Sequence, residues 1–499
     1  PSPIYGLIAT PKTAPAKLRN FKNENGEIVS PLENARKKVF TPNIQLDDKI
    51  AHSIAQNMYD QWQDDFEGLR VLTYEEAIKG VEDDEYVAGI KRSTSPGYGW
   101  PKKGSGKTPW LGSDGEYRTD HPELLARYDE MMKRLENGER SGTIWTDTLK
   151  DERRTLEKVR IGKTRLFSAG ELTYLIVFRR YFGDFAGRLT RLRMMKESCV
   201  GINPYSKEWN HIARELEKFP HIVAGDFGNY DGTLNASGLW YVLDLINALY
   251  NDDNSEIRRL LWLDIVHSIH VTNSQGISLL YMWTHSQPSG CPITALLNSV
   301  YHSFIARYVF ILIALDKSPE HANCRAFQNN VVHFSYGDDD LYSISPDIIE
   351  WYNQLTMTEY FPKIGMEYTD ETKSKNPKPA RTLSEVSFLK RKFRFDDDQM
   401  RYRAPLSLDT ILEMAQWVRG TKDVHLLTKE TMEEAVFELS QHDRETFETH
   451  IGAFKKAGKL LMTPPSLMTY DEYQSAEYYK HVAGLPKMSL CVIKDGPTI

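Results

Sequence analysis

Cysteine is scarce in this chain, and its scarcity limits the kinds of site the chain can build. Only four cysteines occur in 499 residues, at Cys199, Cys291, Cys324 and Cys491, and none of them are spaced as a paired metal-binding motif. A structural zinc site and a disulfide-stabilised secreted domain are therefore both disfavoured. The cysteine content instead fits a protein that works in a reducing compartment.

Uninterrupted hydrophobic runs and a net basic charge are also missing. The most apolar long stretch, residues 294–315, contains Asn298, His302 and Arg307, so it predicts a buried core helix rather than a membrane span. The formal net charge of −7 does not by itself indicate a nucleic-acid binder. Any such site has to come from charge that is segregated along the chain.

Signal peptides, internal repeats and low-complexity tracts are absent from the sequence. The chain starts at Pro1 without a methionine, which favours release from a longer precursor. Its length predicts two to four substructures, and an apolar content of 40% is ordinary for a globular protein.

The residues that carry chemistry are centred on 337–340, which read Gly-Asp-Asp-Asp. β-Forming residues flank this stretch at 331–336 and 341–344, so the pattern predicts a β-hairpin with its turn at Gly337-Asp338. Three carboxylates at a hairpin tip repel one another unless a cation lies there, and hard oxygen ligands suit Mg²⁺. A solvated acidic turn is the alternative for this stretch alone.

A second carboxylate site is predicted at Asp226. The apolar residues 222–225 predict a strand that ends at Asp226, followed by a turn with Asp231 and a helix over about 236–250. Asp226 would then face the hairpin, and Asp231 would point into the space between them. A carboxylate there can accept a hydrogen bond from a ribose hydroxyl. A pair of helix-capping carboxylates is the alternative.

A loop of small residues precedes the long apolar helix. Ser289-Gly290 would allow the close approach of a nucleotide to the backbone, although N-capping by Ser289 is the alternative. Thr294 and Asn298 are four residues apart and share one face of the predicted helix. On an otherwise apolar helix, that polar face needs a partner.

The most basic window covers residues 150–165, where seven basic and three acidic side chains give a net charge of +4. Its apolar residues predict strands joined near Gly162, hence a basic hairpin that lines a channel and offsets triphosphate charge. Residues 91–103 combine basic side chains with Tyr98 and Trp100, which could hold a nucleic-acid backbone and stack a base. The alternatives are a solvated charged face and a plain loop with buried aromatics.

The remaining segments are predicted in outline. Residues 1–45 read as an extended segment draped over the fold, and 365–374 as a polar, turn-rich stretch. Helices are expected at 47–66, 121–137 and from Leu406 onward, and a basic strand-like segment at 388–395.

In their order along the chain, these segments resemble the RNA-dependent RNA polymerases of picornavirus-like positive-strand RNA viruses, above all the dicistrovirus and iflavirus branch that infects insects. The resemblance implies catalytic roles for Asp226, Asp338, Asp339 and Lys373, with the three aspartates as metal ligands and Lys373 as the general acid for pyrophosphate. For nucleotide binding it implies Lys158, Lys163, Arg165, Asp231, Ser289, Gly290, Thr294 and Asn298. For RNA binding it implies Thr94, Ser95, Gly97, Tyr98, Lys150, Arg154, Lys390 and Arg391.

The fold implied by the resemblance is α+β, a closed right hand whose palm is an antiparallel sheet on helices and whose thumb is helical. The expected divisions are fingers at 1–185 and 236–288, palm at 186–235 and 289–395, and thumb at 396–499. The implied cofactors are two Mg²⁺ ions, with Mn²⁺ able to substitute.

The implied function is template-directed RNA synthesis from ribonucleoside triphosphates, which replicates a positive-strand RNA genome. The implied partners are an RNA template and its product duplex, a small VPg-like protein primer and other viral replication proteins. The implied location is the host cytoplasm, at replication complexes, after release from a polyprotein.

The sequence departs from the family pattern in three ways. Asp340 adds a third acid with no assigned role, Pro292-Ile293 replace smaller residues in the nucleotide loop, and Pro1 stands where picornaviral enzymes begin with glycine. The two alternative functions are those of a reverse transcriptase and of a non-catalytic viral RNA-binding protein. Asp231 with Asn298 favours acceptance of a ribose, and the intact set of carboxylates and basic residues disfavours a decayed site.

Overall fold

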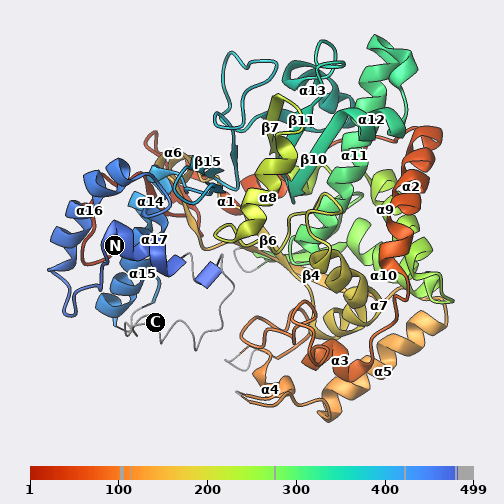
Figure 1. Ribbon diagram of the computed structural model, residues 1–499. Helices are drawn as coiled ribbons and strands as arrows, with labels where there is room; N and C mark the ends of the chain where they lie inside the picture. Colours follow the sequence, from red (N-terminus) through yellow and green to blue (C-terminus); the bar gives the residue numbers. More distant parts are fainter. Residues whose placement is uncertain (102–105, 114, 275–276, 421–422, 478–479, 482–499) are drawn as a thin grey trace.

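The chain folds into helices and strands around two four-stranded sheets. The computed structural model describes residues 1–499 except 102–105, 114, 275–276, 421–422, 478–479 and 482–499. In Figure 1 the C-terminal helices form a lobe at the left, and the N-terminus lies within that lobe. The rest of the chain extends from the central sheet at the top to the N-terminal helices at the bottom right.

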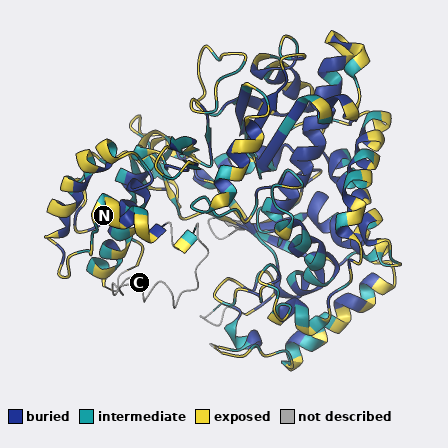
Figure 2. Ribbon diagram, in the orientation of Figure 1, coloured by how far each residue is buried: buried dark blue, intermediate teal, exposed yellow. Residues whose placement is uncertain are grey.

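The central sheet is antiparallel throughout and has the strand order β10-β11-β7-β12. Its strands are β7 (His221–Gly228), β10 (Val331–Tyr336), β11 (Asp339–Ile344) and β12 (Glu367–Asp370). Val223 and Tyr342 belong to the main hydrophobic core on one side of this sheet. Ala224 and Leu341 belong to a smaller cluster with Trp209 on the other side. Both faces are therefore covered, and Figure 2 shows the sheet as almost wholly buried.

Helices lie on the two sides of the central sheet. The helices here are α8 (Lys207–Leu216), α9 (Ala236–Tyr250), α11 (Thr294–Lys317), α12 (Cys324–Asn330) and α13 (Gln354–Tyr360). Among the described residues, α11 alone is long and apolar enough to cross a membrane, and 94% of its most apolar window is buried inside the protein. A helix that is apolar all round is what a core position requires. The predicted core helix is confirmed.

The side sheet has the strand order β6-β4-β8-β9, with a parallel pairing between β4 and β8. Its strands are β4 (Ile144–Leu149), β6 (Leu166–Ala169), β8 (Ile269–Ser274) and β9 (Ile277–Met282). The helices of this region are α2 (Asp48–Trp62), α3 (Tyr74–Lys79), α4 (Thr108–Leu111), α5 (Pro122–Glu136), α6 (Leu156–Arg160), α7 (Leu172–Arg191) and α10 (Ser255–Val266).

The N-terminal segment crosses from the C-terminal lobe to the side sheet. Ile4 is buried in the hydrophobic cluster of the C-terminal helices, and β1 (Thr13–Pro15) pairs with β5 (Arg153–Thr155). The segment then forms β2 (Phe21–Lys22), β3 (Ile28–Val29) and α1 (Pro31–Arg36). The expected draped segment is thus confirmed, with its contacts spread over two regions of the fold.

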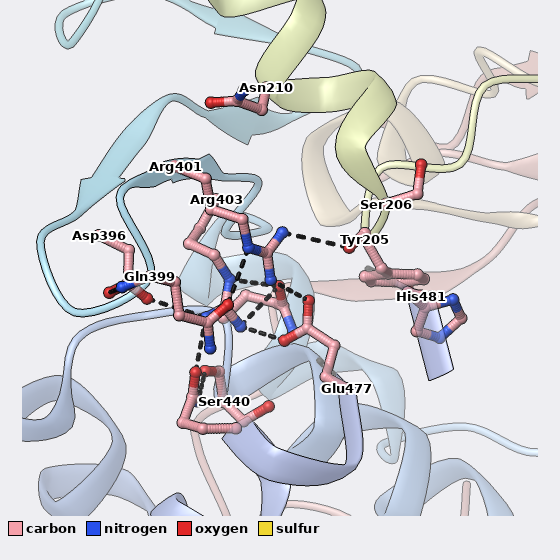
Figure 3. Close-up of polar contacts among 12 residues, drawn as sticks. Tyr205, Ser206, Asn210, Asp396, Gln399, Arg401, Arg403, Ser440, Glu477 and His481 are labelled. Atoms are coloured by element: carbon pink, nitrogen blue, oxygen red, sulfur yellow. Dashed lines mark hydrogen bonds and ion pairs between the residues drawn. The ribbon is translucent and has the colours of Figure 1, made fainter. Parts of the chain in front are cut away.

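The C-terminal lobe joins the central sheet through two short hairpins, β13 (Ser387–Phe388) with β14 (Arg391–Lys392), and β15 (Arg394–Asp396) with β16 (Arg401–Arg403). Its helices are α14 (Leu408–Met414), α15 (Val424–Leu439), α16 (Arg444–Gly458) and α17 (Tyr470–Glu477). Figure 3 shows Arg401 and Arg403 directed toward Glu477 of α17, and both form ion pairs with that buried carboxylate. The last residues of the expected thumb, 482–499, lie outside the described part of the chain.

Local structure departs from the sequence prediction in three places. Residues 156–160 form helix α6 rather than a strand, because the basic window folds as a strand, a short helix and a turn before β6. Residues 367–370 form strand β12, since their backbone pairs with β7. Strand β7 continues to Gly228, so Asp226 lies inside the strand and not at its end. The predicted helices near 47–66, 121–137 and 236–250 are confirmed.

Candidate active site

A single cavity of about 390 Å³ gathers most of the predicted catalytic and nucleotide-binding residues. It lies between the central sheet, the side sheet and the start of α11. The predicted residues in its wall are Arg154, Lys158, Lys163, Arg165, Asp226, Asp231, Ser289, Asn298, Asp338 and Lys373. Side chains that are distant in sequence therefore face one space with opposite charges on its two sides.

The carboxylates of Asp226 and Asp338 lie on the central-sheet side of the cavity. Strand β7 pairs directly with β11, so Asp226 is held beside the turn that carries Asp338. Burial raises the pKa of Asp338, and the neighbouring charge of Asp226 raises it further. The Lys373 ammonium lies 2.9 Å from Asp226 Oδ2. Two hard oxygen donors in one pocket are the donor set that a divalent ion with substrate phosphates requires.

Asp339 and Asp340 differ from Asp338 in their surroundings. Asp339 does not line the cavity, and burial with the adjacent charges of Asp338 and Asp340 raises its pKa to about 7. Asp340 is buried and accepts hydrogen bonds from the Gly225 backbone N–H at 2.7 Å and from Tyr368 Oη at 3.1 Å. Asp340 therefore ties the hairpin to strands β7 and β12.

His302 of α11 also holds the hairpin in place. Its Nε2 lies 3.0 Å from Asp340 Oδ2, and its Nδ1 lies 3.0 Å from the carbonyl oxygen of Gly337. Ser299 Oγ accepts a hydrogen bond from the Gly337 N–H at 2.9 Å. The carbonyl oxygen and the N–H of Gly337, the residue before Asp338, thus both have a partner in α11. The sequence alone indicates no role for Asp340, because its anchoring partners are distant along the chain.

Asp231 and Asn298 form the predicted polar pair. Asn298 Nδ2 donates a hydrogen bond to Asp231 Oδ1 at 2.8 Å, which bears out the expectation that the polar face of the helix needs a partner. Gln287 donates from its amide to Asn298 Oδ1, while its own Oε1 is buried without a partner among the described residues. Burial raises the pKa of Asp231, and the Asn298 hydrogen bond opposes that shift. The pair thus presents a hydrogen-bond acceptor, the Asp231 carboxylate, and a hydrogen-bond donor, the Asn298 amide, in the cavity.

The loop before α11 packs tightly on strand β6. Ser289 Oγ accepts a hydrogen bond from the Ser168 N–H at 3.2 Å. A Cβ atom at Gly290 would lie 2.0 Å from the Ser168 carbonyl oxygen, so only glycine fits this approach. Thr294 Oγ1 donates within the loop, to the carbonyl oxygens of Ser289 and Cys291. Gly290 therefore allows the loop before α11 to pack directly on strand β6. Its predicted closeness to a nucleotide stays a prediction.

The basic window contributes cations on the opposite side of the cavity. Glu152 is the shared acid of this window, and Arg165 donates to it through Nε at 2.6 Å. Lys150 and Arg154 also lie 3.7 Å from Glu152 oxygens. Arg165 is additionally within electrostatic reach of Asp338 and Asp231. Glu152 thus holds the Arg165 guanidinium in place, near the carboxylates of Asp338 and Asp231.

The loop predicted to hold the template borders a separate, smaller cavity. Thr94 and Ser95 line a space of about 170 Å³ beside Gly290. Tyr98 is 49% exposed and accessible to a ligand. Trp100 is buried, with its Nε1 donating to Glu171 at 2.9 Å, so for Trp100 the alternative of a loop with buried aromatics holds and base stacking does not. Gly97, by contrast, is needed where it is, because a Cβ there would meet the Gly170 carbonyl at 2.4 Å.

The two basic residues of the β13–β14 turn have different surroundings. Lys390 is exposed and close enough to Asp339 to lower that carboxyl's pKa. Arg391 is largely buried and pairs with Glu438 of α15 through both of its terminal nitrogens. The Arg391 guanidinium therefore joins the central region to the C-terminal lobe, and only Lys390 is free to meet a ligand from solvent.

Some residues of the nucleotide cavity were not anticipated. Lys38, Trp283 and Gln287 all line it, although none of these three residues was itself assigned a nucleotide role. Gln287 directly precedes the small-residue loop, and that position was an available signal. Lys38 and Trp283 have no such signal, because only the folded chain brings them to the cavity.

Comparison with known proteins agrees with this geometry. The protein family described as viral RNA-dependent RNA polymerase matches residues 5–459. The chain is 39% identical over 94% of its length to a replicase polyprotein of Cricket paralysis virus, and 38% identical over 92% of its length to that of Acute bee paralysis virus. It spans 28% and 24% of those polyproteins, so it corresponds to about a quarter of each.

A solved structure supports the fold independently. The Sicinivirus 3Dpol RNA-dependent RNA polymerase superposes with a TM-score of 0.78 over 96% of this chain and 94% of its own, at 20% sequence identity. That likeness confirms the expected α+β right-hand architecture. The matches to insect viruses also confirm the expected branch of relatives. With the paired carboxylates, the cationic wall and the Asp231–Asn298 pair in one cavity, the chain belongs to the viral RNA-dependent RNA polymerase family.

Proposed function

We propose that this chain catalyses template-directed RNA synthesis from ribonucleoside triphosphates, and thereby replicates a positive-strand RNA genome. The observation that carries the proposal is the cavity in which Asp226 and Asp338 face Lys158, Lys163 and Arg165. Nucleotidyl transfer is an in-line displacement at phosphorus, so positioning and charge stabilisation dominate its catalysis. A cavity with acids on one wall and cations on the other provides both.

Polymerases of this family use divalent metal ions. In this chain Asp226 and Asp338 fit as the ligands, because both carboxylates face the cavity and Asp226 raises the pKa of its neighbour. When bound, two Mg²⁺ ions, or Mn²⁺ in their place, stabilise the attacking 3′-oxygen and the leaving pyrophosphate. Among the described residues no three metal-binding side chains gather closely enough to enclose an ion alone. Substrate oxygens would supply the remaining ligands, and Asp339 would add negative charge from just outside.

The other residues have roles that follow from their places. Arg165 would offset triphosphate charge, and Lys373, held 2.9 Å from Asp226, would donate a proton to the departing pyrophosphate. The Asp231–Asn298 pair would accept and orient the ribose hydroxyls. Thr94, Ser95, Tyr98 and Lys390 would contact RNA. Residues 1–185 and 236–288 would act as fingers, 186–235 and 289–395 as palm, and 396–499 as thumb.

The wider setting is part of the same proposal. The matched relatives are replicase polyproteins, which supports release of this chain from a longer precursor and action beside other viral replication proteins. A small VPg-like protein primer would start synthesis, in replication complexes of the host cytoplasm. The RNA template and its product duplex would occupy the space between the C-terminal lobe and the side sheet.

The test is primer extension on an RNA template with Mg²⁺ and either ribonucleotides or deoxyribonucleotides. We expect ribonucleotide addition that is abolished by EDTA and by Asp338→Asn, with the folding of the variant unchanged. Asp347→Asn is the control, because it makes the same change at an exposed residue. Normal synthesis by a folded Asp338→Asn chain would contradict the metal assignment. Preferential use of deoxyribonucleotides would indicate a reverse transcriptase instead.

A further inference from the structure

Lys38 lies in the wall of the nucleotide cavity although it belongs to the N-terminal segment. It follows helix α1, in a short 3₁₀ turn over Lys37–Val39. Its neighbour Lys37 is exposed and borders a different surface hollow, beside Glu33 and Arg160. Two adjacent lysines of the same turn thus point to different places, and only one reaches the cavity.

The backbone of Lys38 is fixed against the turn that carries Asp231. Asn229 Nδ2 donates a hydrogen bond to the Lys38 carbonyl oxygen at 2.6 Å. A Cβ atom at Gly232 would lie 2.6 Å from that same oxygen, so the two segments are in close contact. Thr41 Oγ1 donates to the Gly232 carbonyl at 2.6 Å. Lys38 is therefore positioned by the same turn that positions Asp231.

The charges around Lys38 are unbalanced. Burial, together with the nearby cations Lys163, Arg154, Arg165 and Lys158, lowers the pKa of its ammonium to about 8. Within the described part of the chain, Lys38, Lys158 and Lys163 have no carboxylate within ion-pair distance, whereas Glu152 and Asp226 balance the other cations of the cavity. Three uncompensated ammonium groups repel one another unless a polyanion lies among them.

The cations of this wall differ in how close they are to the catalytic acids. Arg165 is within electrostatic reach of Asp338 and Asp231, and Lys158 is within reach of Asp226. The charged groups with the largest effect on the pKa of Lys38 are cations, and Lys163 has the largest effect among them. Asp226, Asp231 and Asp338 line the same cavity, and in the described part of the chain none of them forms an ion pair with Lys38. A nucleotide whose α-phosphate is at these acids would have its outer phosphates among the cations of that cavity, Lys38 and Lys163 included.

We infer that Lys38 binds the β- and γ-phosphates of the incoming nucleoside triphosphate, and afterwards the pyrophosphate that leaves. This inference rests on the proposed function, and it adds a substrate contact from a segment outside the basic window. It also gives the N-terminal segment a part in substrate binding, because the backbone contacts of Lys38 join that segment to the turn of Asp231.

The kinetic test compares Lys38→Met and Lys38→Arg with Lys37→Met as the matched control. Loss of one charge-assisted contact to phosphate should raise the KM for ribonucleotides by about 10-fold in Lys38→Met, with kcat changed by less than about 3-fold. Lys38→Arg keeps the charge and should stay within about 3-fold of the unaltered chain. Lys37→Met should leave both constants unchanged. Equal KM values for Lys38→Met and Lys37→Met would overturn the inference.

A binding measurement separates this inference from the polymerase proposal. Equilibrium dialysis with labelled inorganic pyrophosphate and Mg²⁺ needs no template and no synthesis. We expect pyrophosphate to bind about 10-fold more weakly to Lys38→Met than to Lys37→Met, while both variants melt at the same temperature. That result would hold for Lys38 even if primer extension failed. Equal binding by the two variants, or none by the unaltered chain, would overturn the role of Lys38.

Discussion

At the scale of single residues, the hairpin places three consecutive acids in three different environments. Asp338 faces the cavity, Asp339 lies beside it, and Asp340 is buried and bonded to the Gly225 N–H, His302 and Tyr368. A buried carboxylate is stable only where donors surround it, and Asp340 has three. Its structural role explains why a third acid is tolerated where an apolar residue is more usual.

Asp340→Ala should destabilise the fold. The change leaves the Gly225 N–H, the Tyr368 hydroxyl and the His302 ring without their buried acceptor, and breaking such a buried pair costs about 3–5 kcal/mol. Thermal unfolding followed by circular dichroism would measure this loss of stability. Asp397→Ala, at an exposed aspartate, should leave the melting temperature unchanged. A similar melting temperature for both variants would show that Asp340 is not an anchor.

At the scale of elements, the loop before α11 and strand β6 act as one unit. The Ser168 N–H donates to Ser289 Oγ, and the Ser168 carbonyl lies where a side chain at Gly290 would begin. Ser168 Oγ in turn donates to the buried Asp147 of β4 at 2.5 Å. The loop of the nucleotide cavity is therefore supported by two strands of the side sheet.

Gly290→Ala should separate this loop from β6 and reduce RNA synthesis by at least about 10-fold, because small displacements of positioning groups have large kinetic effects. The readout is kcat/KM in primer extension. Gly452→Ala is the control, since Gly452 lies in α16 with open space around its Cα and alanine favours the helix by about 1 kcal/mol. Full activity of Gly290→Ala would mean that the loop can move without loss of function.

At the scale of the whole molecule, the N-terminal segment links the C-terminal lobe to the side sheet. Glu413 of α14 is buried and accepts hydrogen bonds from the Lys12 N–H at 2.6 Å and from Thr13 Oγ1 at 2.5 Å. Arg153 of β5 donates to the Glu413 carbonyl oxygen. One residue of the lobe thus holds both strands of the β1–β5 pair, and so links the lobe to the basic window.

Glu413→Ala should weaken this link and shorten the residence of the chain on RNA. We expect several-fold faster dissociation from a primed template, measured as the loss of extendable complexes after a heparin challenge. Extension within a single binding event should change much less, because Glu413 does not line the cavity. Glu434→Ala, at an exposed position of α15, should behave as the unaltered chain. Equal dissociation rates for the two variants would exclude the link as a determinant of RNA retention.

Several parts of this protein could be predicted from local sequence. The hairpin at 331–344 and helix α9 follow from patterns of neighbouring residues, and the structure confirms both. The order of the motifs was enough to indicate the polymerase family. The prediction was wrong where tertiary pairing overrides local preference, as in β12, which exists because it pairs with β7. Tertiary contacts also decided between the two alternatives for Trp100, because its burial depends on Glu171 and Trp110.

The sequence by itself determined which chemical groups are available and which of them lie close along the chain, since turns, caps and hydrophobic periods are local properties. Only the tertiary structure decided which distant groups share a space. It brought Lys38 to the nucleotide cavity, buried Asp340 among its donors, and paired Arg391 with Glu438 instead of leaving it for RNA. Burial and charge pairing depend on distances in space, and these are set by how the sheets and helices pack.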